Sequence, residues 1–101
     1  MSTKEMRKHS GVVSGFLKGL ANRDRLLILC ELAEGEKSVT SLIEATGIAQ
    51  TSMSQHLSKL KDENMVSFRR EHRTLYYFIS HDAVRDVMGV LHQHFCKESK
   101  T

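Results

Sequence analysis

Apolar residues in the first quarter of the chain recur at helical spacing. The positions i, i+3, i+4 and i+7 are occupied by Val13, Phe16, Leu17 and Leu20. One face of a helix that starts near Glu5 is therefore apolar, although Gly15 and Gly19 weaken that helix. Asn22 is a suitable N-cap for a second helix that ends before Gly35. Its apolar side chains run nearly all round, which predicts a central helix: Leu26, Leu27, Ile28, Leu29 and Leu32.

The middle of the chain predicts two short helices joined by a four-residue turn. Ser41 and Glu44 have the spacing of a capping box at the start of the first, and Gly47 closes it. The second covers Gln50 to Glu63. Its apolar stripe consists of Met53, Leu57 and Leu60, and its other side carries Ser52, Gln55, His56 and Lys59. We predict a helix-turn-helix unit here.

From Met65 the period of apolar residues changes to two. Val66 and Phe68 alternate with polar residues, and 74–79 is rich in aromatic and branched side chains, so we predict a hairpin with a charged tip at 70–73. A final helix is predicted from Asp82 to about Lys97, two residues suited to its positive and negative ends. Its apolar stripe consists of Val84, Val87, Met88, Leu91 and Phe95.

These elements predict a mainly α fold with a small β-hairpin: a winged helix-turn-helix of five helices and a two-stranded wing. The 101 residues fit a single domain over 1–101, since no repeat, proline or linker marks a boundary. The outer helices cannot both bury their apolar faces in so small a core, so we expect them to form a two-fold homodimer. No apolar stretch is long enough for a membrane span or an export signal, which favours a cytoplasmic protein without a membrane partner.

Charge is segregated along the chain, although the net charge is only +3. Residues 1–25 carry six basic and two acidic groups, and residues 49–75 carry five and three. Residues 26–48 carry one basic and four acidic groups. The positive charge is therefore segregated into two segments, one with the first helix and one with the second half of the helix-turn-helix and the hairpin, although the net excess is too small to identify a polyanion partner by itself.

Four stretches of the chain resemble the ArsR/SmtB family of winged-helix repressors. They are 17–26 (LKGLANRDRL), 38–42 (SVTSL), 50–60 (QTSMSQHLSKL) and 73–77 (RTLYY), within a match over about residues 12–97. The most specific is Ser52-Met53-Ser54-Gln55-His56-Leu57, which resembles the recognition helix of the family. The resemblance implies a regulator that binds double-stranded operator DNA.

Polar side chains on a helix of this kind can bond to base edges in the major groove, and basic residues at a wing can bond to phosphates. The candidate DNA-binding residues are Gln50, Thr51, Ser52, Ser54, Gln55, His56, Lys59, Arg69, Arg70, His72 and Arg73. A solvated helix face and an edge-protecting turn would look similar in sequence. For His56, local hydrogen bonding and base contact both remain open.

The metal sites that the family implies are absent from the matching positions. The segment 38–42 lacks a Cys-x-Cys pair, and the last-helix positions are occupied by Ser80, Asp82, Gln93 and Cys96, a poor set for zinc. His92 and His94 are two residues apart on a helix and point in different directions, as solvent-facing histidines do. We therefore expect no metal and no cofactor, and a metal-responsive repressor is the alternative.

Two cysteines, Cys30 and Cys96, are either buried thiols or a redox pair. Taken alone, Cys30 reads as a small buried residue among leucines, and burial would make its thiol inert. Yet the two positions resemble those of the BigR, SqrR and HlyU subgroup. That resemblance implies redox sensing, in which reactive sulfur species act as inducer and link the two cysteines through a disulfide or short polysulfide bridge.

The hypothesis from sequence is a homodimeric transcriptional repressor released from its operator when Cys30 and Cys96 become linked. A winged-helix regulator without an inducer site is a further alternative. A protein-interaction module would use the exposed apolar helix faces and show no affinity for duplex DNA. An enzyme is not expected, because the chain lacks a catalytic set, a phosphate-binding glycine loop and a carboxylate pair in a credible context.

Overall fold

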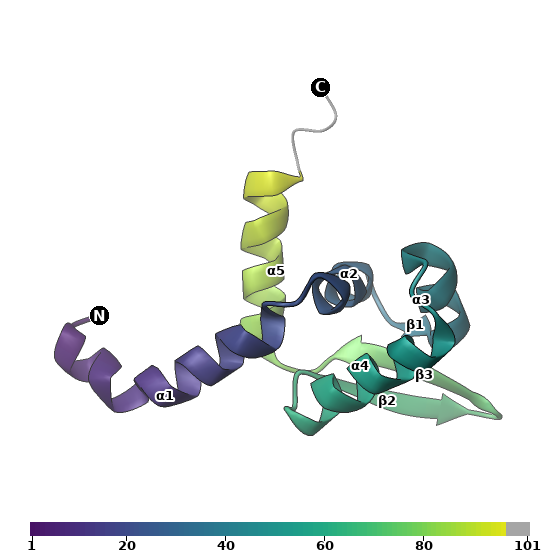
Figure 1. Cartoon of the computed structure of the whole chain (residues 1–101), viewed down its shortest axis with the longest axis horizontal. Helices are drawn as coiled ribbons and strands as arrows, with labels where there is room; N and C mark the ends of the chain where they lie inside the picture. The colour runs from purple at the N-terminus through teal and green to yellow at the C-terminus, as the bar shows by residue number, and fades with distance from the viewer. Residues whose placement is uncertain (97–101) are drawn as a thin grey trace.

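The computed structural model describes residues 1–96 and contains five helices and three strands within them (Figure 1). In chain order these are α1 (Thr3–Leu20), α2 (Arg23–Leu32), β1 (Lys37–Ser38), α3 (Val39–Thr46), α4 (Gln50–Asp62), β2 (Val66–Glu71), β3 (Thr74–Ile79) and α5 (Asp82–Phe95). The winged helix-turn-helix prediction is confirmed. Lys97, the predicted end of the last helix, lies outside the described residues.

Side-chain caps explain where the first two helices begin. Ser2 and Glu5 form a capping box, so α1 starts at Thr3, two residues before the predicted start. The carboxamide oxygen of Asn22 accepts a hydrogen bond from the Arg25 backbone N–H at 3.0 Å, which confirms the predicted cap of α2. That helix ends at Leu32, three residues before Gly35.

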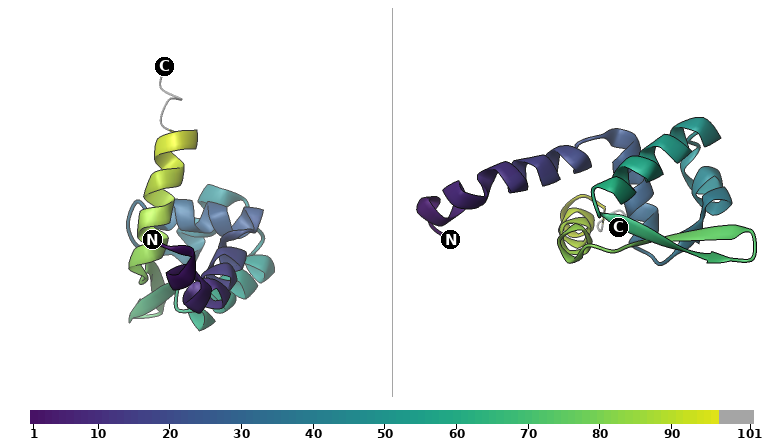
Figure 2. Two further views of the ribbon diagram at one scale, coloured as in Figure 1. Left: turned by 90° about the vertical axis from the view of Figure 1, so that its left-hand side faces the viewer. Right: turned by 90° about the horizontal axis from the view of Figure 1, so that it is seen from below.

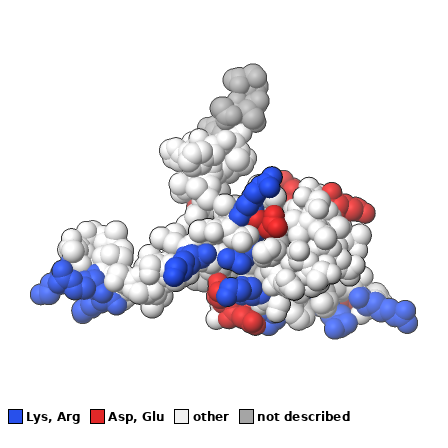
Figure 3. Space-filling model, viewed as in Figure 1, with Lys and Arg blue, Asp and Glu red and all other residues white. Residues whose placement is uncertain are grey.

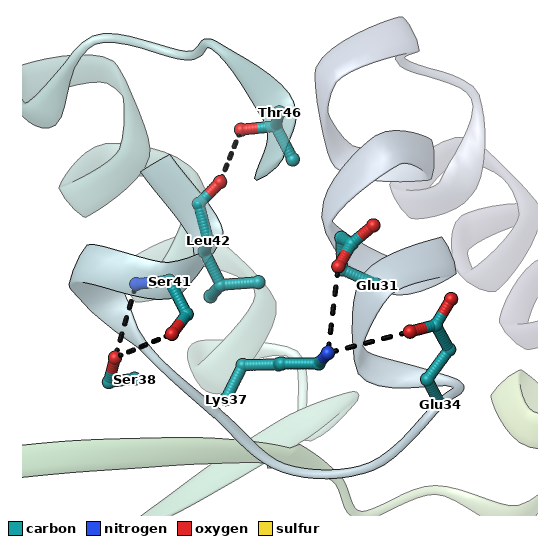
Figure 4. Close-up of polar contacts among 7 residues, drawn as sticks. All are labelled: Glu31, Glu34, Lys37, Ser38, Ser41, Leu42 and Thr46. Carbon is teal, nitrogen blue, oxygen red and sulfur yellow. Dashed lines mark hydrogen bonds and ion pairs between the residues drawn. The ribbon is translucent and has the colours of Figure 1, made fainter. Parts of the chain in front are cut away.

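The predicted cap of the third helix was wrong by three residues. The Ser38 hydroxyl, not that of Ser41, accepts the backbone N–H of the first turn, and the donor is Ser41 at 3.1 Å (Figure 4). At the other end Thr46 donates to the Leu42 carbonyl oxygen, and Gly47 takes the left-handed conformation (φ 77°). The helix therefore begins directly after β1, without a linker.

The hairpin belongs to a three-stranded antiparallel sheet in the order β1-β3-β2, not to a two-stranded wing alone. β1 pairs with β3 through Lys37 opposite Tyr77, and its two residues are too few to show a period of two in the sequence. β2 and β3 pair from Val66–Ile79 to Glu71–Thr74, which leaves a two-residue loop with His72 in the left-handed region (φ 59°). The tip is therefore shorter than the predicted 70–73.

The apolar stripes read from the sequence meet in one core. The fully buried side chains include Ile28 and Leu29 of α2, Leu42 of α3, and Val84 of α5. From α4, the turn after it and the start of β2, the core takes Met53, Leu57, Leu60, Met65 and Val66. The helix-turn-helix therefore sits against both α2 and the sheet, which holds α4 in a defined orientation.

Two helices extend away from this core. α1 projects from one end of the molecule, opposite the hairpin, and the second half of α5 projects in a different direction (Figures 1 and 2). The exposed apolar side chains include Val12 of α1, and Val90 and Phe95 of α5. Within residues 1–96 no helix combines the length and the apolar composition that crossing a bilayer requires.

Candidate nucleic-acid interface and thiol groove

The side chains of α4 point in three directions besides the core. Met53, Leu57 and Leu60 are buried, as the sequence predicted. At 100° per residue, Thr51, Gln55 and Asp62 lie farthest from this stripe, and all three are exposed; Asp62 is the last residue of the helix. They are therefore the side chains of α4 that protrude most directly from the molecule.

A second row of α4 side chains faces the hairpin. A groove of about 500 Å³ separates the two elements; α4 lines it with Gln50, Ser54, Ser58 and Lys61, and the hairpin with Arg73 and Thr74. Sequence reasoning missed Ser58 and Lys61. The signal was present, because the four α4 residues follow the spacing i, i+4, i+8 and i+11. The groove thus presents hydroxyl, amide and cationic groups along one side of the recognition helix.

The third row of α4 consists of Ser52, His56 and Lys59, of which His56 faces Asp24 at the start of α2. His56 is only 20% exposed, and its Nε2 lies 3.6 Å from Oδ2 of Asp24. Ser52, one turn earlier, is half-buried. Lys59, one turn later, is exposed and pairs with Glu63 at 3.4 Å. The sequence left open whether His56 bonds locally or contacts a base. In the structure its neighbour is a carboxylate of another helix, Asp24.

Three of the four candidate residues of the hairpin are exposed without a described ion-pair partner: Arg70, His72 and Arg73. Arg69 differs. Its Nε donates to both carboxylate oxygens of Glu36 at 3.0 and 3.1 Å, and its NH1 donates to Glu71 at 3.0 Å. Its guanidinium also lies over the ring of Tyr76, 4.7 Å from the centroid.

This engagement of Arg69 perturbs both partners. The hydrogen bonds from Arg69 lower the pKa of the Glu36 carboxyl, and those to Glu36 and Glu71 raise the pKa of the guanidinium above its usual value. Two acceptors and an aromatic face therefore occupy Arg69 before any phosphate arrives.

Basic side chains are spread over one extended face of the molecule. Figure 3 shows Lys and Arg gathered over the outer half of α1, over the place where α1 meets α2 and α4, and at the hairpin tip. Lys18, Arg25 and Lys59 line a small pocket at the second of these places. The outer two basic groups lie on either side of α4, whereas acidic side chains accompany the central group, including Glu63 in the same pocket.

Cys30 and Cys96 open on the same groove. It has a volume of about 410 Å³, lies between α2 and α5, and has almost entirely apolar walls: Leu26, Leu27, Ala33, Met88, Leu91 and Phe95, with His92 beside them. Both thiols are exposed, so the reading of Cys30 as a buried residue was wrong. Leucines surround it in sequence, but it lies on the side of α2 that, with Leu26, Leu27 and Ala33, faces the groove toward α5 and the solvent.

The groove still suppresses the reactivity of Cys30. Partial burial against its apolar walls raises the pKa of the Cys30 thiol, and nearby Cys96, Glu31 and Glu34 raise that pKa further. Glu31 and Glu34 themselves bind Lys37, with Nζ to Oε1 distances of 3.8 and 3.4 Å (Figure 4). At neutral pH a smaller fraction of Cys30 is therefore thiolate than in an ordinary cysteine.

The positions examined for metal ligands are not gathered within one chain. Ser80 and Asp82 stand at the start of α5 and Gln93 and Cys96 at its end, and Asp82 pairs with Arg85 at 2.8 Å. Residues 1–96 contain no group of three or more His, Cys, Asp or Glu placed to hold a metal ion. His92 and His94 are exposed, as their spacing predicted.

The sequence matches a family model and is similar to known regulators. Residues 22–67 match the family model "Bacterial regulatory protein, arsR family". The nodulation protein NolR of Rhizobium meliloti is 44% identical over 87 residues, which span 86% of this chain and 71% of NolR. The transcriptional activator HlyU of Vibrio cholerae is 35% identical over 100 residues, which span 99% of this chain and 93% of HlyU.

A solved structure extends the likeness to three dimensions. The crystal structure of the transcriptional repressor BigR from Xylella fastidiosa matches with a TM-score of 0.89 and 32% identity, over 95% of this chain and 98% of BigR. HlyU and BigR are transcriptional regulators, not enzymes. The chain therefore belongs to the ArsR family of bacterial regulatory proteins and is a DNA-binding transcriptional regulator.

Proposed function

We propose that this regulator is a homodimeric repressor that acts in the cytoplasm on a pseudo-palindromic operator. One observation carries the proposal: the exposed polar rows of α4 lie beside a groove whose far wall is a basic hairpin. An α-helix fits the major groove, and a hairpin beside it reaches the flanking backbone. Along the face drawn in Figure 3, basic side chains lie on both sides of α4.

The proposed contacts divide into two kinds. Thr51 and Gln55 would read base edges, because they are the uncharged side chains in the first half of α4 that lie farthest from its buried stripe. Phosphates would be bound by Arg70, His72 and Arg73 of the hairpin and by the basic first half of α1. The remaining candidates, Gln50, Ser52, Ser54 and Lys59, border these contacts on α4.

The proposed dimer uses α1 and α5 as its dimerisation helices, within one winged-helix domain over 1–101. Their support is the exposure of Val12, Val90 and Phe95, which are 78%, 57% and 76% exposed. Large apolar side chains exposed on two projecting helices are typical of a protein interface. A second copy of the same chain would bury them symmetrically. A two-fold axis would set the recognition helices about 34 Å apart, one turn of the duplex.

The DNA-binding part is tested on a duplex that the wild-type protein selects from a random-sequence library. We expect Gln55→Ala to relax the choice of base at one position per half-site, at a cost of about 1–3 kcal/mol in discrimination. Glu44→Ala, an exposed change on α3, is the control and should leave both the affinity and the choice of bases unchanged. Binding of the wild type should fall steeply with salt. An affinity that does not change with salt concentration, or a failure to select any duplex from the library, would overturn the proposal.

The proposed inducers are reactive sulfur species, and the support is that both thiols open on one groove. One thiolate attacks the outer sulfur of a persulfide, R–S–SH. This forms a protein persulfide, Cys–S–SH, and releases R–S⁻. The second thiolate attacks the inner sulfur, forms the Cys30–Cys96 disulfide and expels HS⁻. The two thiol protons end on the departing R–S⁻ and HS⁻, and the sulfane sulfur is reduced while the cysteines are oxidised. A bridge between α2 and α5 would favour one dimer geometry over another and so change DNA affinity.

The switch is tested by treating DNA-bound protein with a persulfide and following release alongside intact mass. The wild type should lose two hydrogens and leave the duplex, whereas Cys30→Ser and Cys96→Ser should each stay bound. Release of Cys30→Ser at the wild-type rate would remove the proposed switch.

A regulator without an inducer site is the second candidate. The raised pKa of the Cys30 thiol favours it, because such a thiol reacts slowly at neutral pH. Under this alternative the wild type stays on DNA after persulfide treatment and its mass is unchanged.

A further inference from the structure

We infer that two acidic residues, Asp24 in the first turn of α2 and Glu36 in the loop that follows this helix, are positioning residues that hold the DNA-reading elements in place through His56 and Arg69. This inference rests on the proposed function and deepens it. It reassigns two of the candidate DNA-binding residues: His56 and Arg69 act on DNA binding through their acidic partners and not by touching DNA.

The first pair connects α2 to the recognition helix. Asp24 stands in the first turn of α2, and its carboxylate faces the imidazole of His56 at 3.6 Å. The imidazole is four-fifths covered, whereas Thr51 and Gln55 of the same helix are open. The His56 side chain, covered in this way, cannot reach a base edge without a rotation of α4. It can, however, set the rotation and tilt of that helix against α2.

The second pair connects the end of α2 to the hairpin. Glu36 lies in the loop between α2 and β1, and its carboxylate accepts hydrogen bonds from both Nε and NH2 of Arg69. The partners are 33 residues apart in sequence, so the contact fixes tertiary geometry and not local structure. Tyr76 on β3 supports the guanidinium from the other side. Planar bidentate pairs of this kind restrain orientation more than single ion contacts do.

The two pairs give α2 a particular place in the fold. It bears Cys30 in its last two turns, contacts the recognition helix at its start, and contacts the hairpin through the loop at its end. A movement of α2 caused by a bridge to Cys96 would therefore reach both DNA-reading elements. This is the kind of contiguous polar connection through which two sites can be coupled.

The decisive test removes the charge of the acidic partners. A purely electrostatic effect and a positioning role predict opposite changes in DNA affinity. Removing a negative charge beside DNA should tighten binding if only the field matters or if Arg69 is thereby freed for a phosphate. If Asp24 and Glu36 position α4 and the hairpin, Asp24→Asn and Glu36→Gln should each weaken binding, by about two- to fivefold. The measurement is the affinity for the duplex selected by the wild type. The matched control is Glu44→Gln, an exposed acid of α3 with no described partner.

The basic partners give a second readout. If Arg69 neutralises a phosphate, Arg69→Gln reduces the slope of log affinity against log salt by about 0.9. The positioning role predicts an unchanged slope with a lower affinity. Arg70→Gln, the adjacent residue, is the control that should reduce the slope. The exchanged pair, Glu36→Arg with Arg69→Glu, should recover part of the affinity lost by either single change.

Amide hydrogen exchange of the free protein separates this inference from the proposed function. Glu36→Gln should speed exchange in 66–79 and Asp24→Asn in 50–62, relative to wild type and to Glu44→Gln, whether or not a duplex is bound. Unchanged exchange, or tighter DNA binding by either acid variant, would overturn the inference. If the wild type binds no duplex at all, the proposed function fails and the exchange experiment still decides the positioning roles.

Discussion

The body formed by α2, α3, α4 and the sheet differs sharply from the two helices that project from it. The body supplies nearly all of the buried apolar side chains, whereas α1 contributes Leu20 and α5 contributes Val84 and Met88. Val12 and Phe95, farther out on the same two helices, are largely exposed. The difference shows that one chain is sufficient to bury the core of the helix-turn-helix and the sheet, while its projecting helices keep exposed apolar side chains.

The largest expected effect is in the body. Leu57 is 1% exposed and packs α4 onto the core, so Leu57→Ala should reduce the free energy of unfolding by about 2–5 kcal/mol. Urea unfolding measures this, with Ser58→Ala, the exposed neighbour on the same helix, expected to stay within about 0.5 kcal/mol of wild type. Equal losses for both variants would show that the core does not lie where the structure puts it.

The projecting helices should respond in assembly and not in folding. Val12→Asp and Val90→Asp place a charge on surface that we propose is buried against a second copy, which should dissociate the dimer and lower operator affinity by about 100-fold. Sedimentation and DNA titration measure the two effects. Ser14→Asp adds the same charge to α1 at an exposed polar position and is the control. A dimer that tolerates both valine substitutions would end the distinction between body and projecting helices.

Much of the body could be predicted from local patterns. The stripe of Met53, Leu57 and Leu60 and the alternation after Met65 fall at the two periods that helices and strands impose, so α4 and the hairpin were predicted nearly to the residue. β1 was not, because two residues carry no period and its pairing with β3 is a long-range choice. The same reason explains why the cap was predicted at Ser41. Ser38, the true N-cap, is the last residue of β1, and no pattern in the sequence predicted that strand.

The site shows a second limit. Cys30 was read as buried because leucines surround it, but an all-round apolar helix does not reveal which of its sides faces a gap between neighbours. Likewise, His56 and Arg69 look like their polar neighbours in sequence. Only the tertiary partners Asp24 and Glu36 distinguish them, and no local pattern encodes a contact between distant segments.

Helix caps extend the comparison at a smaller scale. Asn22→Ala removes the cap of α2 inside the body and should cost about 1 kcal/mol in global unfolding. Ser2→Ala removes an equivalent cap at the far end of α1, where the helix end lies outside the core. We expect local fraying there, visible by amide exchange, and no measurable change in the urea midpoint. A similar midpoint shift for both variants would mean that the outer end of α1 unfolds together with the body.

The smallest effect concerns the groove where body and projecting helix meet. Glu31 and Glu34 contribute to the raised pKa of the Cys30 thiol, so Glu31→Gln with Glu34→Gln should lower that pKa and increase the thiolate fraction at neutral pH. Because burial is the largest cause and remains, we expect alkylation of Cys30 to be faster by no more than about threefold at pH 7. The rate is measured with iodoacetamide in a Cys96→Ser background.

The pH dependence supplies the sign of this effect. A thiol with a raised pKa stays mostly protonated through the neutral range, so alkylation of the Cys96→Ser parent should continue to accelerate above pH 8, and the double glutamine variant should level off earlier. Glu44→Gln in the same background is the control, since that carboxylate is not among the groups that raise the pKa of Cys30. A slower rate in the double glutamine variant would contradict the electrostatic account. The loss of the Lys37 contacts with Glu31 and Glu34 would then be the dominant change, through a shift of the α2–β1 loop.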